Sequence, residues 1–256
     1  MIGQALTIAY FTVLEAIRNK LFIFTIVLIV AMFGFAGFIG ELAITETEQL
    51  QSVMMGFILR LFSIFVVSLF VITSMVREFD DKGFELLLSL PMQRWTYYLG
   101  KLLGFASLSF VITVLMLLPL LVYSGFSPVL YWGISLWCEL MIMVAASLFC
   151  LFTFGNVTIS FTIVAVFYLL ARTISAIRLM SENPLVSGSS YVQDFIGFML
   201  EGISVVLPDF DLFTRSEWLI YGGLDTDLML QVIGQTIIYV FLLSCASLFD
   251  LYRKNL

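Results

Sequence analysis

Residues 75–95 have the sequence MVREFDDKGFELLLSLPMQRW, and they interrupt two hydrophobic runs that are each long enough to cross a bilayer. Gly83 loosens the backbone, and Pro91 favours a helix break just before it. We therefore expect a short amphipathic helix from about Glu78 to Ser89, a turn, and a new helix that starts near Pro91.

This short helix is expected to lie along the membrane surface, and its two faces differ in chemistry. Phe84, Leu87 and Leu88 fall at helical spacing on one side, while Asp81 and Glu85 share another side. Such a helix can dock on a protein partner or on lipid headgroups.

The same segment carries an ordered motif that extends into the next hydrophobic run. It consists of the acid Glu78, then Gly83-Phe84-Glu85-Leu86-Leu87-Leu88-Ser89-Leu90-Pro91, then Gln93-Arg94-Trp95, then Gly100-Lys101. The motif resembles a pattern between the second and third spans of the permease subunits of ATP-binding-cassette (ABC) transporters of the second exporter type. That pattern is an acid, Gly-Thr-Leu-Glu-Leu-Leu-Leu-Ser-x-Pro, Ser-Arg, an aromatic residue and a later Gly-Lys. Here Phe84 replaces the Thr and Gln93 replaces the Ser.

The resemblance implies that this segment, about residues 77–98, is the coupling element that sits in a cleft of a cytoplasmic ATPase. It also implies a bacterial cytoplasmic membrane and a second permease copy, in a homodimer or a heterodimer. The residues that would couple to the ATPase are Glu78, Asp81, Gly83, Phe84, Glu85, Leu87, Leu88, Pro91 and Arg94.

Composition identifies the chain as an integral membrane protein. It has 256 residues, of which 61% are hydrophobic and 12% charged, and its mean hydropathy is +1.09. A hydrocarbon core about 30 Å thick requires about 20 apolar residues per helix. Six stretches meet this requirement, at about 21–40, 53–76, 99–123, 132–154, 157–177 and 228–250. We therefore expect one all-α transmembrane domain, 1–256, with six spans.

The distribution of basic residues predicts how the chain is oriented. The formal net charge of −6 is less informative than the positions of the charges. A cytoplasmic N-terminus leaves Arg178 and Arg215 outside, together with the acids Glu41, Glu46 and Glu48. It puts most basic residues inside, namely Arg18, Lys20, Arg77, Lys82, Arg94, Lys101, Arg253 and Lys254. The positive-inside rule then places both termini in the cytoplasm.

Several kinds of chemistry are not expected in this chain. It has no histidine, and its cysteines (Cys138, Cys150 and Cys245) lie inside apolar runs, where packing is their usual role. Gly100-Lys101 is no phosphate loop, because Trp95 stands where the first glycine belongs and no Ser or Thr follows the lysine. We therefore expect no catalytic or metal site and no cofactor. ATP and Mg would be bound by a partner ATPase, and no nucleic acid is expected as a partner.

Residues 1–20 are expected to form an interfacial amphipathic helix before the first span. Its apolar residues recur at helical spacing, at Leu6, Tyr10, Val13, Leu14 and Ile17. Such a helix is also implied by the family resemblance, and the alternative is a frayed start of the first span. Within that span, Gly34, Gly37 and Gly40 form a small-residue stripe that would let another helix approach closely.

Three charged residues lie inside predicted spans and away from the first and last few residues of those spans, where an unpaired charge costs about 2–4 kcal/mol. Arg60 lies about seven residues from the outer end of the second span, and Glu139 lies about as deep in the fourth. Arg172 falls in the outer third of the fifth span. Glu139 therefore has two candidate partners, Arg60 and Arg172. Such a pair would either fix helix packing or form a polar outer gate on a substrate path.

The stretch 178–227 is expected to be the only long extracytoplasmic segment. Val192–Leu207 has a helical pattern interrupted by charges and is stopped by Pro208, which predicts a re-entrant or surface helix. Leu207-Pro208-Asp209-Phe210-Asp211-Leu212-Phe213 resembles a second family pattern, Leu-Pro-Asn-hydrophobic-Asp-x-Phe, that precedes the sixth span.

Two functions from different classes remain open at this point. The resemblance implies the transmembrane half of an ATP-driven transporter, exporting a substrate or extracting it from the membrane, with membrane lipids around it. The alternative is an ion-coupled secondary transporter or channel that uses Arg60, Glu139 and Arg172. The chain shows no clear internal repeat, which counts against the alternative. An intramembrane enzyme would need a constellation of reactive side chains that the spans lack.

Overall fold

The computed structural model describes residues 2–19, 21–42, 47–80, 93–182, 199, 202–204, 206–215, 218–219 and 226–253. Within these ranges 93% of the residues are helical and none is in a strand. The helices are α1 (Ile2–Arg18), α2 (Leu21–Leu42), α3 (Thr47–Asp80), α5 (Arg94–Leu120), α6 (Phe126–Phe154), α7 (Val157–Glu182), the single turn α9 (Phe210–Phe213) and α11 (Thr226–Arg253).

Five of these helices are long and apolar enough to cross a membrane, namely those in 51–80, 94–120, 126–154, 157–177 and 226–253. A sixth span is possible at the N-terminus, where α1 and α2 form a pair bent by 55°. The prediction of an all-helical, multi-pass membrane protein is confirmed at this level. Each observed helix extends beyond its predicted span at one end or at both, because helical residues continue beyond the apolar core of the run, and α5 ends at Leu120, three residues before the predicted end.

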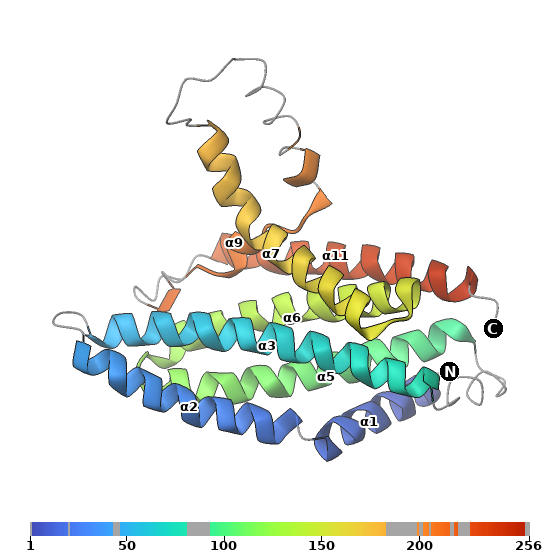
Figure 1. Ribbon diagram of the computed structural model, residues 1–256, viewed down its shortest axis with the longest axis horizontal. Helices are drawn as coiled ribbons and strands as arrows, with labels where there is room; N and C mark the ends of the chain where they lie inside the picture. The colour runs from blue at the N-terminus through green and yellow to red at the C-terminus, as the bar shows by residue number, and fades with distance from the viewer. Residues whose placement is uncertain are drawn as a thin grey trace.

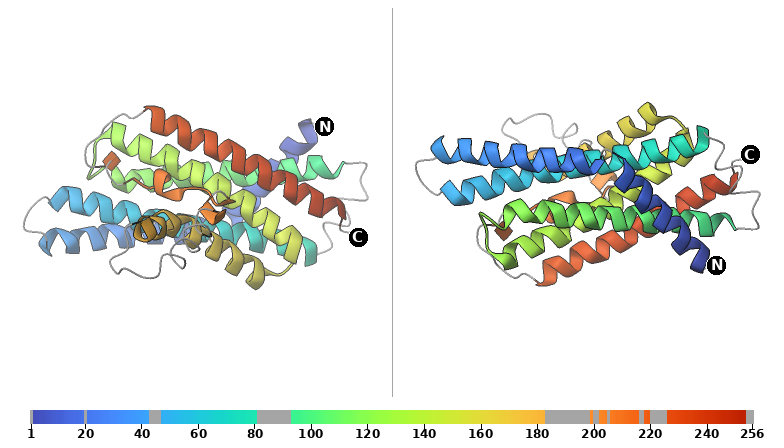
Figure 2. Two further views of the ribbon diagram at one scale, coloured as in Figure 1. Left: turned by 90° about the horizontal axis from the view of Figure 1, so that it is seen from above. Right: turned by 90° about the horizontal axis from the view of Figure 1, so that it is seen from below.

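Helix α6 is the central element of the bundle. It contacts α3, α5, α7, α9 and α11. In the most apolar stretch of α6, 78% of the residues are buried, whereas the corresponding share in α11 is 17%. Figure 2 shows α6 between α5 and α11, with α3 on its other flank. The central position of α6 explains why Glu139, in the middle of this helix, is shielded from the surroundings on every side.

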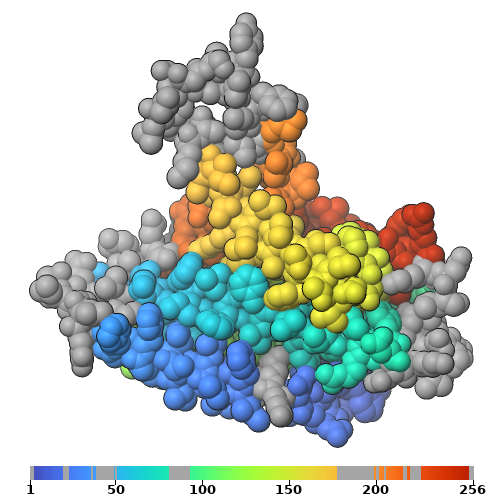
Figure 3. Space-filling model, viewed as in Figure 1, coloured from blue at the N-terminus to red at the C-terminus, as the bar shows by residue number. Residues whose placement is uncertain are grey.

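The outer faces of the bundle are strongly apolar, as a lipid-facing surface requires. On α11, Leu230, Ile237 and Phe241 are each more than 60% exposed. Helix α7 leaves the bundle along its length, so that its C-terminal part rises away from α3 (Figures 1 and 3). On the opposite side, α2 packs against α3 and α1 packs mainly against α5.

Close helix packing occurs at glycines of α5, whereas Gly34 and Gly37 of α2 have open space around them among the described residues. A Cβ atom on Gly104 would lie 2.7 Å from Thr12 Cβ, and one on Gly100 would lie 2.8 Å from Ile8 Cβ. Helix α1 therefore packs directly onto the backbone of α5. By contrast, nothing lies within 4 Å of such an atom on Gly34 or Gly37, so this part of the predicted stripe makes no close contact within the described chain.

One end of the bundle collects both termini, together with Arg77, Arg94 and Arg253 at the helix ends found there. The start of α1, the end of α3, the start of α5 and the end of α11 lie together there (Figure 1). The turn between α6 and α7 is at the same end, where Gly155 adopts a left-handed conformation with φ 67° and its N–H bonds to Leu151 O.

The predicted boundaries of the coupling segment need correction. Helix α3 continues through Glu78 to Asp80, because Phe79 still packs against Phe152, with ring centroids 6.0 Å apart. The next helix begins at Arg94, three residues after Pro91. The rest of the predicted coupling helix lies outside the described residues, and so does most of the predicted Val192–Leu207 helix. The coupling residues that the structure leaves undescribed are Asp81, Gly83, Phe84, Glu85, Leu87, Leu88 and Pro91.

Candidate functional site

A buried ion pair joins two spans in the interior of the bundle. Arg60 Nη1 of α3 lies 2.7 Å from Glu139 Oε2 of α6, and the two side chains are 4% and 0% exposed. Of the two candidate partners of Glu139, Arg60 therefore forms the direct ion pair. Removing either member would leave a charge in a low-dielectric environment, which is far more costly than removing both.

Arg60 makes further hydrogen bonds that hold its guanidinium in place. Nη1 donates to the carbonyl of Phe213 at 3.0 Å and to Ser135 Oγ at 3.4 Å, and Nη2 donates to the carbonyl of Trp132 at 3.4 Å. The guanidinium also lies over the Trp132 ring, 5.0 Å from its centroid. The Ser135 hydroxyl donates to the same Phe213 carbonyl. Arg60 thus connects α3 to α6 and to the segment that follows Pro208.

The segment after Pro208 reaches the ion pair through the single helical turn α9. Phe210 and Phe213 are fully buried, and the Phe210 ring lies 5.6 Å from that of Tyr168 on α7. A helical turn leaves its last carbonyls without intrahelical partners, and here Arg60 and Ser135 satisfy that of Phe213. Burial raises the pKa of the Asp209 carboxyl at the start of this turn.

Arg172 lies near the ion pair and makes no ion pair with any residue that the structure describes. Its guanidinium lies over the Phe57 ring at 5.9 Å, and its charge acts on Glu139 through space. Three buried atoms, Arg172 Nη1, Glu139 Oε1 and Tyr168 Oη, have no hydrogen-bond partner among the described residues. The Tyr168 hydroxyl is close to Glu139 but does not have hydrogen-bond geometry. Buried polar groups normally have partners, so these three atoms mark a place for a further polar group.

A second polar cluster lies at the end of the bundle where the segment 81–92 leaves α3 and enters α5. Glu78 Oε2 lies 2.5 Å from Lys101 Nζ, and Tyr97 Oη donates to Glu78 Oε1 at 3.1 Å. Lys101 is only 5% exposed. One turn before Glu78 in α3, the Ser74 hydroxyl donates to Glu15 Oε1 of α1 at 2.8 Å. These contacts fasten α1, α3 and α5 to one another.

Arg94 fastens the start of α5 to the end of α11. Its Nη1 atom donates to the carbonyls of Leu251 at 2.8 Å and of Tyr252 at 3.3 Å, and its guanidinium lies 5.8 Å from the Tyr252 ring centroid. These carbonyls belong to the last turn of α11, where backbone acceptors lack helical partners. One turn further into α5, Tyr98 donates to Ser244 of α11 at 3.0 Å.

The two clusters contain only some of the residues that the sequence singled out. The structure brings together Arg60, Glu139 and Arg172. Glu78 bonds to Lys101 and Tyr97 within the second cluster, and Arg94 bonds beside this cluster to the end of α11. Ser135 and Trp132 were not predicted as site residues, although they precede Glu139 by four and seven residues and so share its helix face. The Phe213 carbonyl has no sequence signal, because every residue carries a carbonyl group.

Comparison of the chain with models of protein families and with curated proteins finds no match. The class of protein is therefore defined by the fold itself, as a multi-pass helical membrane protein with two internal polar clusters. The family resemblance rests on the residues quoted for it.

Proposed function

We propose that the chain is the transmembrane permease subunit of an ABC transporter, powered by separate cytoplasmic ATPase subunits. It would work beside a second permease copy or a homologous permease, and it would export a substrate or extract it from the membrane. Both termini and the segment 81–92 would be cytoplasmic, in a bacterial inner membrane.

The observation that carries the proposal is the contact between the two ends of the resembled motif. Its first acid, Glu78, and its last basic residue, Lys101, form an ion pair at 2.5 Å although 22 residues separate them in sequence. The intervening segment therefore starts and finishes at one place on the bundle. A docking element needs this arrangement, because a force applied to it then reaches α3 and α5 together.

The geometry of α3 supports a mechanism for coupling. Glu78 and Arg60 are 18 residues apart on this continuous helix, or about 27 Å at 1.5 Å per residue. Closure of the ATPase subunits would displace the end of α3 near Glu78. Because the helix moves as a rigid body, the displacement would reach Arg60, which contacts α6 and α9. The ion-pair cluster would then act as a polar outer gate.

One observation favours the alternative of an ion-coupled carrier. The three buried atoms without partners, on Glu139, Tyr168 and Arg172, resemble the polar groups that line ion pathways. The two functions differ in their energy source. A carrier would move substrate in proteoliposomes that contain this chain alone and a proton or sodium gradient, whereas the permease subunit would require its ATPase and ATP.

The proposed docking element is tested by the double variant Glu85→Arg, Leu88→Asp. We expect it to insert and fold normally but to lose its ATPase in co-purification from native membranes, because the substitution reverses one charge and makes the apolar face polar. The measurement is the ATPase recovered per permease, and the expected loss is at least tenfold. Asp227→Arg, at the first turn of α11 and the opposite end of the bundle, is the control. Recovery of ATPase at the wild-type level would refute the docking assignment.

The proposed orientation is tested by single cysteines in a background that lacks Cys138, Cys150 and Cys245. Cysteines at positions 48 and 211 are expected to react with a membrane-impermeant thiol reagent in intact cells, and a cysteine at position 81 is not. Asp211 is exposed in the structure, so its labelling is not limited by burial. Labelling at position 81 together with protection at 48 and 211 would invert the topology.

A further inference from the structure

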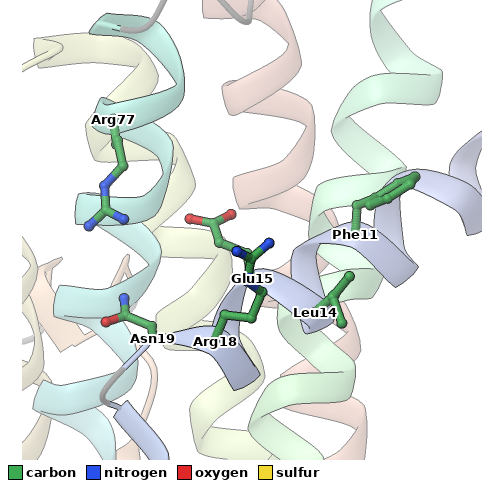
Figure 4. Close-up of a pocket in the computed structure, with 6 residues that line it drawn as sticks. All are labelled: Phe11, Leu14, Glu15, Arg18, Asn19 and Arg77. Atoms are coloured by element: carbon green, nitrogen blue, oxygen red, sulfur yellow. The ribbon is translucent and has the colours of Figure 1, made fainter.

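A hollow lies at the elbow between α1 and α2, where both helices approach α3. Its volume is about 610 Å³, and Phe11, Leu14, Glu15, Arg18 and Asn19 line it from the α1 side. Arg77 of α3 forms the opposite wall. Figure 4 shows the Arg77 side chain pointing toward Asn19 and the Arg18 side chain beside Glu15, with the Glu15 carboxylate between the two guanidinium groups.

The hollow carries an excess of positive charge. Arg18 and Arg77 are exposed, and neither belongs to an ion pair among the described residues. The carboxylate of Glu15 lies between them, and its Oε1 atom accepts a hydrogen bond from Ser74. Two guanidinium groups therefore face one carboxylate, which leaves a net charge of about +1 for a ligand to neutralise.

A second, apolar hollow of about 450 Å³ adjoins the first and shares Asn19 with it. It is lined by Phe24 of α2, by Phe161 of α7 and by residues of α3 that include Phe65, Leu69 and Phe70. The two hollows make one groove with a basic end and an apolar length.

The dimensions of this groove match one leaflet of a bilayer. Arg77, Thr73, Leu69, Val66 and Phe62 follow one another on α3 at spacings of three or four residues, so they share one face of the helix. From Arg77 to Phe62 the helix rises about 22 Å. Half of a bilayer that is about 40–45 Å thick with its headgroups is about 20–22 Å.

We propose that this groove binds one anionic glycerophospholipid. Its phosphate contacts the guanidinium groups of Arg18 and Arg77 from the open side of the hollow, while the Glu15 carboxylate stays bonded to Ser74. One acyl chain runs along α3 over Leu69 and Val66. Guanidinium groups bind phosphate oxygens in a bidentate manner, which suits the two arginines at the headgroup end. The inference requires only that the chain spans a membrane, and it is independent of any ATPase partner.

Such a lipid would connect α1 to α3 beyond the Ser74–Glu15 hydrogen bond. Arg18 belongs to the last turn of α1 and Arg77 to the last turn of α3, so one phosphate bonded to both would bridge the two helix ends. The lipid content of the membrane would then affect how firmly α1 is held against the bundle.

The headgroup contacts are tested by native mass spectrometry of purified protein titrated with dioleoyl phosphatidylglycerol or dioleoyl phosphatidylcholine. A basic residue at the membrane surface favours an anionic lipid about fivefold, so two arginines give an expected preference of about twentyfold or more. Arg18→Gln, Arg77→Gln should abolish this preference. Arg253→Gln, at the end of α11 and outside the groove, should keep it. Equal retention of both lipids by the wild type, or an unchanged preference in the double variant, would overturn the proposal.

The acyl chain contacts are tested by Val66→Trp, which fills the apolar part of the groove. We expect at least a tenfold loss of bound phosphatidylglycerol, while Val114→Trp on the exposed face of α5 should bind it normally. Size-exclusion chromatography checks that both variants are folded. Normal binding by Val66→Trp would refute the acyl path. Inorganic phosphate should not displace the lipid, and displacement at millimolar phosphate would mean that the site binds free phosphate instead.

Discussion

Replacing Arg60 with leucine is expected to reduce the folded yield of the protein more than replacing Arg60 and Glu139 together. In the single variant Glu139 stays fully buried without its 2.7 Å partner. An unpaired buried charge costs about 3–5 kcal/mol, whereas replacing a whole buried ion pair with apolar residues is often close to neutral. The double variant also loses the hydrogen bonds from Arg60 to the Phe213 and Trp132 carbonyls, at about 1 kcal/mol each.

The measurement is a double-mutant cycle on folded yield and on resistance to denaturant, with Arg60→Leu, Glu139→Leu and the combined variant. A parallel cycle with Arg172→Leu should show weaker coupling, since Arg172 makes no direct ion pair with Glu139 in the structure. Arg215→Leu is the control, because Arg215 is exposed. Additive losses in the Arg60 cycle would contradict the pairing, and stronger coupling in the Arg172 cycle would assign Glu139 to the other arginine.

Replacing Gly104 with leucine is expected to push α1 away from the bundle. Even the first atom of the new side chain would lie 2.7 Å from Thr12 Cβ and 3.2 Å from Ala9 Cα, which is backbone and cannot rotate aside. Overpacking of this kind costs about 1–3 kcal/mol or more. Because α1 is also bonded to α3 through Glu15 and Ser74, its displacement would break that contact too.

Hydrogen exchange of the α1 amides measures this effect, and their protection should fall at least tenfold in Gly104→Leu. Gly234→Leu is the matched control, since nothing lies within 4 Å of a Cβ atom on Gly234. Gly104→Ala should have a smaller effect in the same direction. Wild-type protection of α1 in Gly104→Leu would show that α1 does not depend on this contact.

The sequence predicted that the chain is a membrane protein and that Arg60 and Glu139 lie at the same depth in their helices, for simple physical reasons. A bilayer imposes a minimum length on apolar runs, and helix rise converts a position in a run into a depth. Charges at one depth must find one another, because neither water nor lipid tails can replace a partner there.

Other features depended on tertiary contacts that no local pattern encodes. Tyr97, Tyr98 and Lys101 open a predicted span, where such residues commonly face lipid headgroups, yet all three are buried. They turn inward because Glu78 and Ser244 offer partners on neighbouring helices. The pairing of α1 with α5 was readable in principle from the Gly100 to Gly104 spacing, a small-residue pattern that favours close packing of membrane helices.

The long sequence separation of the Arg60 contacts has a consequence for biosynthesis. Glu139 is 79 residues and Phe213 is 153 residues downstream of Arg60. At about 5–20 residues per second, a ribosome needs about 4–16 s to synthesise the first interval and about twice as long for the second. During this time α3 carries an arginine that has neither of its strongest partners. Until α6 has been made, the nascent helix is therefore expected to stay beside the insertion machinery, or to hold Arg60 in contact with water near the N-terminal end of α3.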